Sequence, residues 1–295
     1  MGLLRKNSII HNAHRNITYR RIDFASREAL TEVLADFRPT CVIHSAASGL
    51  QFPRPEWFEL LRFNVDVSIA LCEAAAAVPG CHFVYISTGL GYREQNRPLR
   101  ESDPMDTLHP YGASKAAADL LVRSAAAEFD VPLTVLRPFS FTGVGDPSTR
   151  LFPSLLRAAV EKTPIDLSPG TQFRDHCATS DIAAGIIAAV FSSSSTAGTP
   201  RIFNLGSGKN ISLRTLIEGV LEELGLEVHL NFGARSYARH EPMHLVADIT
   251  HAQTDLGWHP KLNLAYSVWE LAQAAHPSLK LRKPQQCLST QPPRN

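Results

Sequence analysis

Apolar and polar positions in the first two-thirds of the chain alternate between short apolar runs and longer amphipathic segments. The short runs predict strands at 17–22, 41–44, 82–87 and 132–137. The amphipathic segments between them predict helices at 26–37, 55–78 and 111–129. Strands that alternate with helices in this way are typical of a parallel sheet covered by helices, so we expect an α/β fold.

The pattern changes after Arg137, where the loops lengthen and shorter elements are separated by proline, glycine and serine. Helices are expected at 151–161, 180–191 and 212–224, and a strand followed by a turn at 201–208. We therefore expect a sheet domain, a smaller α+β lobe, and a tail that lacks periodicity and is disordered. The sheet domain comprises 1–140 and parts of 175–205, the lobe 141–174 and 206–275, and the tail 276–295.

Composition narrows the classes of partner. The net charge is +1, with 29 Lys and Arg against 28 Asp and Glu, which argues against a nucleic acid or a membrane bound through a basic surface. No apolar run reaches the ~20 residues that span a bilayer, and the first residues lack the apolar core of a signal peptide. The five cysteines form no C-x-x-C pair and the 12 histidines no H-E-x-x-H motif, so we expect reduced thiols, a cytoplasmic location and no metal site.

A tyrosine and a lysine open the third predicted helix, in the motif Tyr111-Gly-Ala-Ser-Lys115. A spacing of four places the phenol and the ammonium on one helix face, one turn apart. A phenol with its ordinary pKa of about 10 is a poor acid–base catalyst at neutral pH, but a neighbouring ammonium favours the phenolate and lowers that pKa. This motif alone is a weak signal, because a solvated helix start would also explain it.

The strand that precedes this helix ends at Ser87-Thr88-Gly89. Thr88 therefore lies at the carboxyl edge of a parallel sheet, where open α/β folds bind their ligands. We expect its hydroxyl to bind a substrate oxygen and hold it against Tyr111. An ordinary strand-end turn would explain Thr88 alone, but Thr88, Tyr111 and Lys115 in this order favour catalysis.

Nine motifs follow one another between about Ile17 and Val268. They are RIDFAS, VIHSAAS, FNVDVSIALCEAA, FVYISTGLGY, HPYGASKAAAD, LRPFSFTGVGD, FRDHCATSDIAAGI, FNLGSGKNISL and VADITHAQTDLGWHP. No single motif is decisive, but in this order they resemble the extended short-chain dehydrogenase/reductase family, in particular its NAD-dependent epimerases and dehydratases that act on nucleoside-diphosphate sugars. The resemblance implies a Rossmann-like doubly wound parallel sheet, a smaller C-terminal α+β substrate lobe, and NAD or NADP as cofactor.

The resemblance also implies roles for single residues. Tyr111 is then the acid–base catalyst, Thr88 the catalytic hydroxyl that also binds substrate, and Lys115 the residue that grips the nicotinamide ribose. Asn64 would support the floor of the site. Further cofactor contacts are implied for Asp23 and Phe24 at the adenine, Ala46 and Ala47 beneath the nicotinamide ribose, and Pro138 and Phe139 beside the nicotinamide.

The nucleoside-diphosphate sugar is implied to contact three residues of the C-terminal half. Ser140 stands where the family usually has an asparagine near the sugar nucleotide. Arg174 matches an arginine that pairs with the diphosphate, and a guanidinium suits this group because its planar fork donates two hydrogen bonds. Arg239 is interpreted either as a second diphosphate arginine or as part of a surface salt bridge, since its spacing to Asp248 is one residue short.

The resemblance breaks at the N-terminus. The family begins with a strand and a G-x-x-G-x-x-G turn that cradles the cofactor pyrophosphate, and the 17 glycines include no such cluster. Residues GLLRKN resemble the end of the family's second strand, so the first strand, which lies mid-sheet, has no counterpart. We expect either a longer functional protein or a shortened form that binds cofactor weakly or not at all. Arg5 and Lys6 would face the 2′-phosphate of NADP or belong to a solvated N-terminus.

The family's dehydratases carry Asp-Glu directly after the catalytic threonine, whereas this chain has Gly89 and Leu90. Dehydration is therefore the weaker alternative. The expected activity is NAD(P)-dependent hydride transfer at C4 of the sugar, by a 4-epimerase or a 4-ketoreductase. The other alternative is a catalytically impaired, truncated paralogue that does not bind cofactor. The resemblance also implies a homodimer through helices 56–78 and 111–129, whose alanine-rich faces permit close approach.

Overall fold

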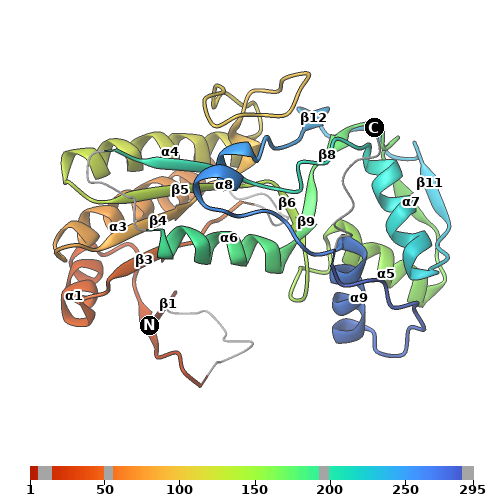
Figure 1. The fold of residues 1–295 in the computed structure, drawn as a ribbon, viewed down its shortest axis with the longest axis horizontal. Coiled ribbons are helices and arrows are strands. Elements are labelled where there is room, and N and C mark those ends of the chain that lie inside the picture. The colour runs from red at the N-terminus through yellow and green to blue at the C-terminus, as the bar shows by residue number, and fades with distance from the viewer. Residues whose placement is uncertain (6–14, 50–55, 193–198, 288–295) are drawn as a thin grey trace. The chain divides into compact units, whose positions relative to one another are not determined.

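The computed structural model describes residues 1–5, 15–49, 56–192 and 199–287, and of Arg5 only the backbone (Figure 1). The described residues form two compact units. The first unit comprises Met1–Gly91, Pro110–Leu136 and Ala189–Ile202, and the second comprises Tyr92–His109, Arg137–Ala188 and Phe203–Asn295.

Most of the α/β elements belong to the first unit. They are β1 (Gly2–Arg5), β2 (Tyr19–Ile22), α1 (Arg27–Phe37), β3 (Cys41–His44), α2 (Trp57–Leu61), the π-helical turn η1 (Arg62–Asp66), α3 (Val67–Ala76), β4 (His82–Ile86), the 3₁₀ turn η2 (Gly89–Gly91), α4 (Pro110–Glu128) and most of β5 (Leu133–Pro138).

A four-stranded sheet in the order β10-β5-β4-β3 is the centre of this architecture, and β10 spans Arg201–Leu205. The strands β3, β4 and β5 run parallel, with Cys41 opposite His82 and Phe83 opposite Leu133. Phe83, Val84 and Tyr85 of β4 have no exposed surface, as expected of a central strand in a parallel sheet. The predicted α/β fold with a parallel sheet is confirmed.

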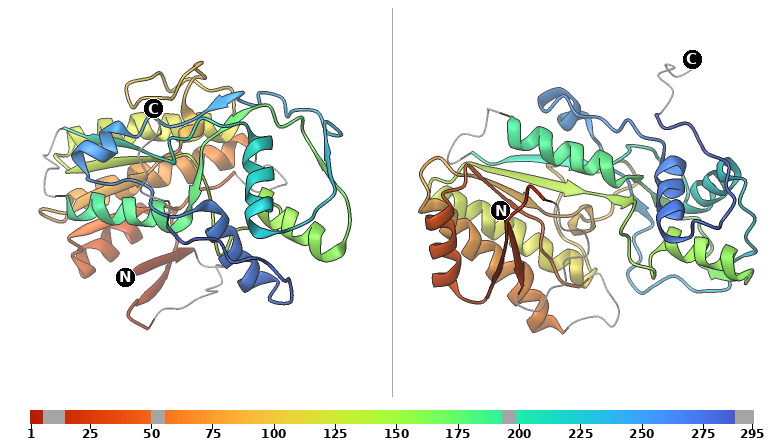
Figure 2. Two further views of the ribbon diagram at one scale, coloured as in Figure 1. Left: turned by 45° about the vertical axis from the view of Figure 1, so that its right-hand side comes forward. Right: turned by 90° about the horizontal axis from the view of Figure 1, so that it is seen from below.

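Three helices cover this sheet. Helix α1 contacts α3, and α3 contacts α4, so that the three lie side by side, red-orange to yellow in the right panel of Figure 2. Apolar side chains of these helices and of β4 form one core, including Leu30, Leu71 and Val122. Helix α1 begins where the sequence predicted, because the Ser26 hydroxyl caps it by accepting a hydrogen bond from the Ala29 backbone N–H.

The strands β1 and β2 form a separate parallel pair, with Leu3 opposite Arg20. Among the described residues, β3 pairs with β4 alone and β1 with β2 alone. The sheet therefore divides at the position expected for the family's first strand. Ile43 of β3 is 49% exposed, which is unusual for an apolar strand residue of a parallel sheet.

The second unit has shorter strands than the first, as predicted after Arg137, but its helices are of similar length. Its elements are β6 (Ser140–Thr142), α5 (Leu151–Glu161), β7 (Ile165–Leu167), β8 (Phe173–Arg174), β9 (His176–Ala178), most of α6 (Thr179–Phe191), the end of β10, α7 (Leu213–Leu224), β11 (Leu230–Phe232), β12 (His244–Leu245), α8 (Thr250–Asp255) and α9 (Leu264–Ala275).

A second core joins α5, α7 and α9, with Leu155, Ile217 and Val268 among its buried residues. The parallel pairs β6–β9, β7–β11 and β8–β12 are only two or three residues long. Each joins segments distant in sequence, so local patterns did not predict them.

Three boundaries differ from the sequence-based expectations. Residues 92–109 and 137–140 belong to the second unit and not to the sheet domain. Residues 277–287, expected within a disordered tail, pack on the second core through Leu279 and Leu281, and Gln286 O accepts a hydrogen bond from Asn263 N. Residues 288–295 lie outside the described part of the chain.

Helix length and hydropathy bear on membrane insertion. None of the helices in the described residues combines the length and the apolar character needed to cross a bilayer.

Candidate active site

Thr88, Tyr111 and Lys115 all belong to the first unit, and all three side chains are buried. Thr88 follows β4, and its hydroxyl accepts a hydrogen bond from Leu90 N at 3.2 Å, which closes the turn into η2. Helix α4 carries Tyr111 and Lys115 and packs directly on η2. The fold thus brings the predicted trio to the carboxyl end of β4, where a parallel sheet offers a ligand site.

Lys115 is held by two neighbours on β4. Its Nζ donates a hydrogen bond to Ile86 O at 2.7 Å and lies 4.3 Å from the centroid of the Tyr85 ring. The side chain is only 1% exposed, and burial lowers its pKa to about 7. The negative charge of Asp119 opposes this effect. Burying an ammonium that makes few hydrogen bonds costs free energy, so the charged state of Lys115 depends on the groups around it.

Asn64 connects the first turn of α4 to the loop after β3. Its Oδ1 accepts a hydrogen bond from Ser48 N, and its Nδ2 donates to Ser48 O and to Ser114 Oγ, each at 2.8 Å. Ser114 in turn donates to Tyr111 O at 2.8 Å. Asn64 lies within η1, and π-helical turns often mark functional sites. This arrangement fits the supporting role expected of Asn64.

His44 continues the same network at the end of β3. Its Nε2 lies 2.9 Å from Ser68 Oγ, and Ser68 donates to Asn64 O at 2.7 Å. Burial, and then the positive charge of Lys115, lower the pKa of His44 to about 3. The imidazole is therefore neutral at physiological pH and adds no positive charge beside Lys115.

The residues expected at the adenine lie at the start of α1. Asp23 is exposed, and its Oδ1 accepts a hydrogen bond from Ala25 N at 3.0 Å. It borders an open hollow of about 390 Å³ that is also lined by Arg20, Arg21, Ile22, Ser26, Ala29 and Glu32. Phe24 is half-buried and packs against the first core, so only part of its ring remains for a ligand.

Ala46 and Ala47 follow β3, where Ala46 is exposed and Ala47 half-buried. They directly precede Ser48, whose peptide groups bind Asn64. The loop expected beneath the nicotinamide ribose is therefore hydrogen-bonded to η1 through Asn64. The side chain of Arg5 and the whole of Lys6 lie outside the described part of the chain, so their expected contact with the 2′-phosphate of NADP stays a prediction.

The remaining predicted residues belong to the second unit, where Arg137 directly precedes the first of them, Pro138. Arg137 is buried and donates hydrogen bonds to Tyr92 Oη at 2.7 Å and to Glu101 O at 2.9 Å. Phe139 stacks on the Tyr92 ring, with a centroid distance of 6.2 Å, and follows Pro138, the last residue of β5. Ser140 begins β6, opposite His176 of β9.

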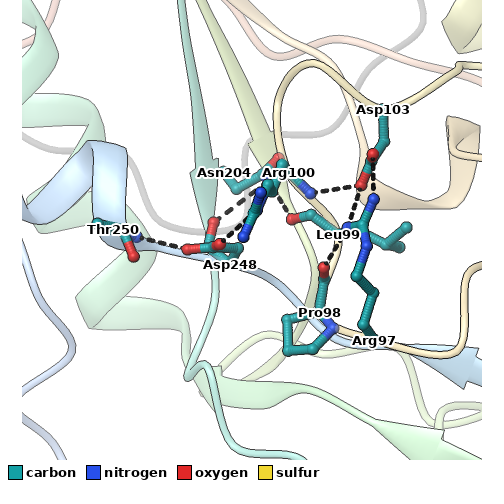
Figure 3. Close-up of polar contacts among 8 residues, drawn as sticks. All are labelled: Arg97, Pro98, Leu99, Arg100, Asp103, Asn204, Asp248 and Thr250. Carbon is teal, nitrogen blue, oxygen red and sulfur yellow. Dashed lines mark hydrogen bonds and ion pairs between the residues drawn. The ribbon is translucent and has the colours of Figure 1, made fainter.

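The segment 92–109, which joins η2 to α4 in the sequence, has its own set of polar contacts (Figure 3). Asn204 Nδ2 donates to Leu99 O at 2.8 Å, and Arg97 forms two hydrogen bonds with Asp103. Arg100 lies 3.3 Å from Asp248. These contacts explain why this segment belongs to the second unit.

Arg174 of β8 is the buried cation of the second unit that sequence reasoning assigned to the diphosphate. It forms an ion pair with Glu241 and donates to its neighbouring Phe173 O at 2.8 Å. Burial lowers its pKa, whereas the charges of Glu241 and Glu94 raise it. Arg239 lies on an exposed turn, where its side chain makes no hydrogen bond or ion pair with other described residues. The salt bridge considered for Arg239 is thus not seen in the described part of the chain.

Sequence reasoning missed several polar residues beside the trio. Ser114 and Asp119 lie on α4 in the same turn as Lys115 or the next one, and helical spacing alone could have singled them out. His44 and Ser68 carried no such signal, because their pairing joins β3 to α3 across 24 positions.

Comparisons with known proteins show the family of this chain. The sequence model described as "NAD dependent epimerase/dehydratase family" matches residues 3–206. The UDP-glucose 4-epimerase of Corynebacterium glutamicum is 30% identical over 82% of this chain and 78% of its own length. The dTDP-6-deoxy-L-talose 4-dehydrogenase (NAD(P)(+)) of Kitasatospora kifunensis is 29% identical over 84% of this chain and 80% of its own.

A solved structure adds the fold. MoeE5 in complex with UDP-glucuronic acid and NAD superposes with a TM-score of 0.78 at 25% identity, over 88% of this chain and 86% of that one. The chain belongs to the NAD-dependent epimerase/dehydratase family, within the extended short-chain dehydrogenases/reductases.

Proposed function

We propose that this chain catalyses NAD(P)-dependent hydride transfer at C4 of a nucleoside-diphosphate sugar, as a 4-epimerase. The observation that carries the proposal is the buried pair Tyr111 and Lys115 on α4, packed on the turn that follows Thr88 at the carboxyl end of β4. The relatives named above act at C4 by their names, which supports the same position of attack.

In this proposal Tyr111 takes the proton of the sugar 4-hydroxyl and returns it at the end of the reaction. Thr88 binds the same oxygen and orients it toward the phenol. Lys115 supplies the positive charge that favours the phenolate. The hydrogen bonds of Asn64 and Ser114 hold the first turn of α4, so that the phenol keeps its position between proton transfers.

The described residues fit two parts of NAD(P), the nicotinamide ribose and the adenosine. Lys115 Nζ has three N–H groups and donates one of them to Ile86, which leaves donors for ribose hydroxyls. The buried hydroxyl of Ser87 has no hydrogen-bond partner in the described part of the chain. Asp23 and the hollow beside it would receive the adenosine. When bound, the cofactor supplies the hydride acceptor and donor. The glycine-rich turn for the pyrophosphate has no counterpart in the 295 residues.

In the second unit, Arg174 is proposed to bind the substrate diphosphate, because it is a buried guanidinium whose fork can donate two hydrogen bonds. Ser140 is proposed to contact the sugar nucleotide, and Pro138 and Phe139 to border the nicotinamide. The exposed Arg239 is the second diphosphate candidate.

A 4-ketoreductase is the second candidate, and the similarity to a 4-dehydrogenase supports it. The two activities differ in the net use of cofactor. An epimerase returns the hydride to the sugar, whereas a reductase consumes one reduced cofactor for each product. Dehydration lacks support, since Gly89 and Leu90 cannot act as acid or base. An impaired paralogue would retain the fold without turnover.

Product analysis tests this proposal. The chain is incubated with UDP-glucose and NAD, and the products are identified by proton NMR while cofactor absorbance is recorded. We expect a C4 epimer without net change in cofactor, and complete loss of product in Tyr111→Phe. The control Tyr19→Phe removes a phenol hydroxyl from β2 and should keep full turnover. No turnover by the parent chain with any of several nucleotide sugars and either cofactor would favour the impaired paralogue.

We also propose a homodimer through α2, α3 and α4. Large apolar side chains on α2 and α4 face solvent, and these two helices contact each other. They are Trp57, Phe58 and Leu61 on α2, and Leu120 and Leu121 on α4. Exposed apolar clusters of this kind mark protein interfaces, and a two-fold axis would place the same patch of a second copy against them.

A cytoplasmic location is proposed as well. The five cysteines are all free, which suits a reducing compartment.

A further inference from the structure

Asp119 is a carboxylate with no exposed surface in the middle of α4. It lies four positions after Lys115 and four before Arg123, so the three side chains share one helix face. Arg123 Nε donates a hydrogen bond to Asp119 Oδ1 at 2.9 Å and is 31% exposed. A buried carboxylate is costly unless it is compensated, and Arg123 compensates it from the solvent side.

Lys115 lies one helical turn before Asp119 on α4. Lys115 is almost completely shielded from solvent, and within the described residues its ammonium contacts a carbonyl oxygen and an aromatic ring. Neither contact carries a full negative charge. Burial lowers the pKa of Lys115 to about 7, and Asp119 is the charge that raises it.

The other groups around Lys115 add no charge near neutral pH. Burial holds His44 of β3 neutral, because its pKa falls to about 3. Burial, and then Asp119, raise the pKa of Tyr85 of β4 well above 10, so this phenol stays protonated. Asn64 of η1 and Ser68 of α3 are uncharged. The charge balance at Lys115 therefore depends on Tyr111, Asp119 and, behind Asp119, Arg123.

We infer that Asp119 is a positioning residue that keeps the side chain of Lys115 charged and in place beside Tyr111. The inference rests on the proposed function, since Lys115 must be an ammonium to favour the phenolate of Tyr111. It adds an electrostatic arrangement along α4, in which Lys115 and Arg123 share the negative charge of Asp119, and Lys115 stabilises the catalytic phenolate.

Titration of Lys115 by NMR tests the inference without cofactor or substrate. The chain has seven lysines, so protein labelled with carbon-13 at the lysine ε position gives few signals, and Lys115→Met identifies the one of Lys115. We expect Asp119→Asn to lower the titration midpoint by about one pH unit or more, because an opposite charge has been removed. Arg123→Gln should raise the titration midpoint of Lys115, because the carboxylate of Asp119 is then no longer shared between Lys115 and Arg123.

Glu128→Gln is the matched control, since it removes a carboxylate at the exposed end of the same helix and should leave the midpoint unchanged. An unchanged midpoint in Asp119→Asn would overturn the inference. If this variant does not fold, Arg123→Gln decides in its place: an upward shift supports the inference, and an unchanged midpoint overturns it.

Turnover separates this inference from the proposed function. In an active chain, Asp119→Asn should move the alkaline limb of the kcat profile to lower pH, and Asp119→Glu should restore it. If Tyr111→Phe kept full turnover while Lys115 still responded to Asp119, the proposed function would fail and the inference would stand. Loss of turnover in Tyr111→Phe without such a response would reject the inference alone.

Discussion

Asn64→Ala removes the side chain that joins the loop after β3 to the first turn of α4. The carboxamide makes three hydrogen bonds of 2.8 Å, two with the Ser48 peptide groups and one with Ser114 Oγ. At about 1 kcal/mol for each bond, the variant should lose about 3 kcal/mol of unfolding free energy. This is a large part of the roughly 5–15 kcal/mol by which folded domains are stable.

The assay combines urea unfolding, followed by circular dichroism, with hydrogen exchange measured by mass spectrometry. Because the chain has two units, exchange should localise the loss. Peptides from 45–49 and from the start of α4 should exchange faster, whereas peptides from α7 in the second unit should not change. The control is Asn231→Ala, which removes a single hydrogen bond to Asp166 at 2.9 Å in an exposed pair and should cost about 0.5 kcal/mol or less.

Equal stability of Asn64→Ala and Asn231→Ala would refute this reasoning. It would mean that water replaces the three hydrogen bonds without cost. Faster exchange spread evenly over both units would also contradict the assignment, because Asn64 would then contribute to general stability and not to the position of α4.

Three further predictions concern other parts of the molecule. Burial lowers the pKa of His44 to about 3. The neutral imidazole therefore stabilises the fold fully above the unfolded pKa of about 6.5, and this stabilisation is lost as the pH falls toward 3. Between pH 6.5 and 5 the loss is about 2 kcal/mol. His44→Gln should flatten the dependence of unfolding free energy on pH by that amount, and an unchanged slope would count against the buried neutral imidazole. Glu241→Gln should free Arg174 from its ion pair and tighten UDP binding, measured by calorimetry, about tenfold. Glu218→Gln, which breaks the exposed ion pair with Arg214, should have no effect. Equal or weaker UDP binding in Glu241→Gln would show that Glu241 does not compete with the diphosphate. Phe58→Glu should convert the proposed dimer to a monomer, as measured by light scattering. Leu108 of the second unit is about as exposed as Phe58, and Leu108→Glu should leave the dimer intact. A parent chain that is already monomeric would reject the interface.

The sequence predicted the α/β elements well where one pattern covers a whole element. Helix α4 was predicted at 111–129 and spans Pro110–Glu128, because alanine and leucine are frequent along it and Pro132 follows its end. Strand β4 was predicted from a continuous apolar run, which is typical of a strand buried on both faces.

Predictions were weaker where the structure depends on distant partners. The helix expected over 55–78 contains a π-helical turn at Arg62–Asp66, and the polar contacts of Asn64 cross 16 and 50 positions. No local pattern encodes such contacts. The placement of 92–109 in the second unit likewise depends on Asn204, which lies about a hundred positions further along the chain.

Site residues were predictable as types but not as networks. Tyr111 and Lys115 carry a recognisable spacing, whereas the ion pair of Arg174 with Glu241 joins residues 67 positions apart. The sequence therefore singled out Lys115 and Arg174 by residue type, whereas the pairing of Arg174 with Glu241 is known only from the structure.

The fate of the C4 hydrogen tests the central claim most directly. A nucleotide sugar deuterated at C4 is incubated with the chain and cofactor, and the product is examined by NMR and mass spectrometry. Hydride transfer between the sugar and the cofactor, with Tyr111 moving the proton of the 4-hydroxyl, predicts an epimer that keeps deuterium at C4, formed by the parent chain and not by Tyr111→Phe. An epimer with solvent hydrogen at C4, or equal turnover in Tyr111→Phe, would contradict it.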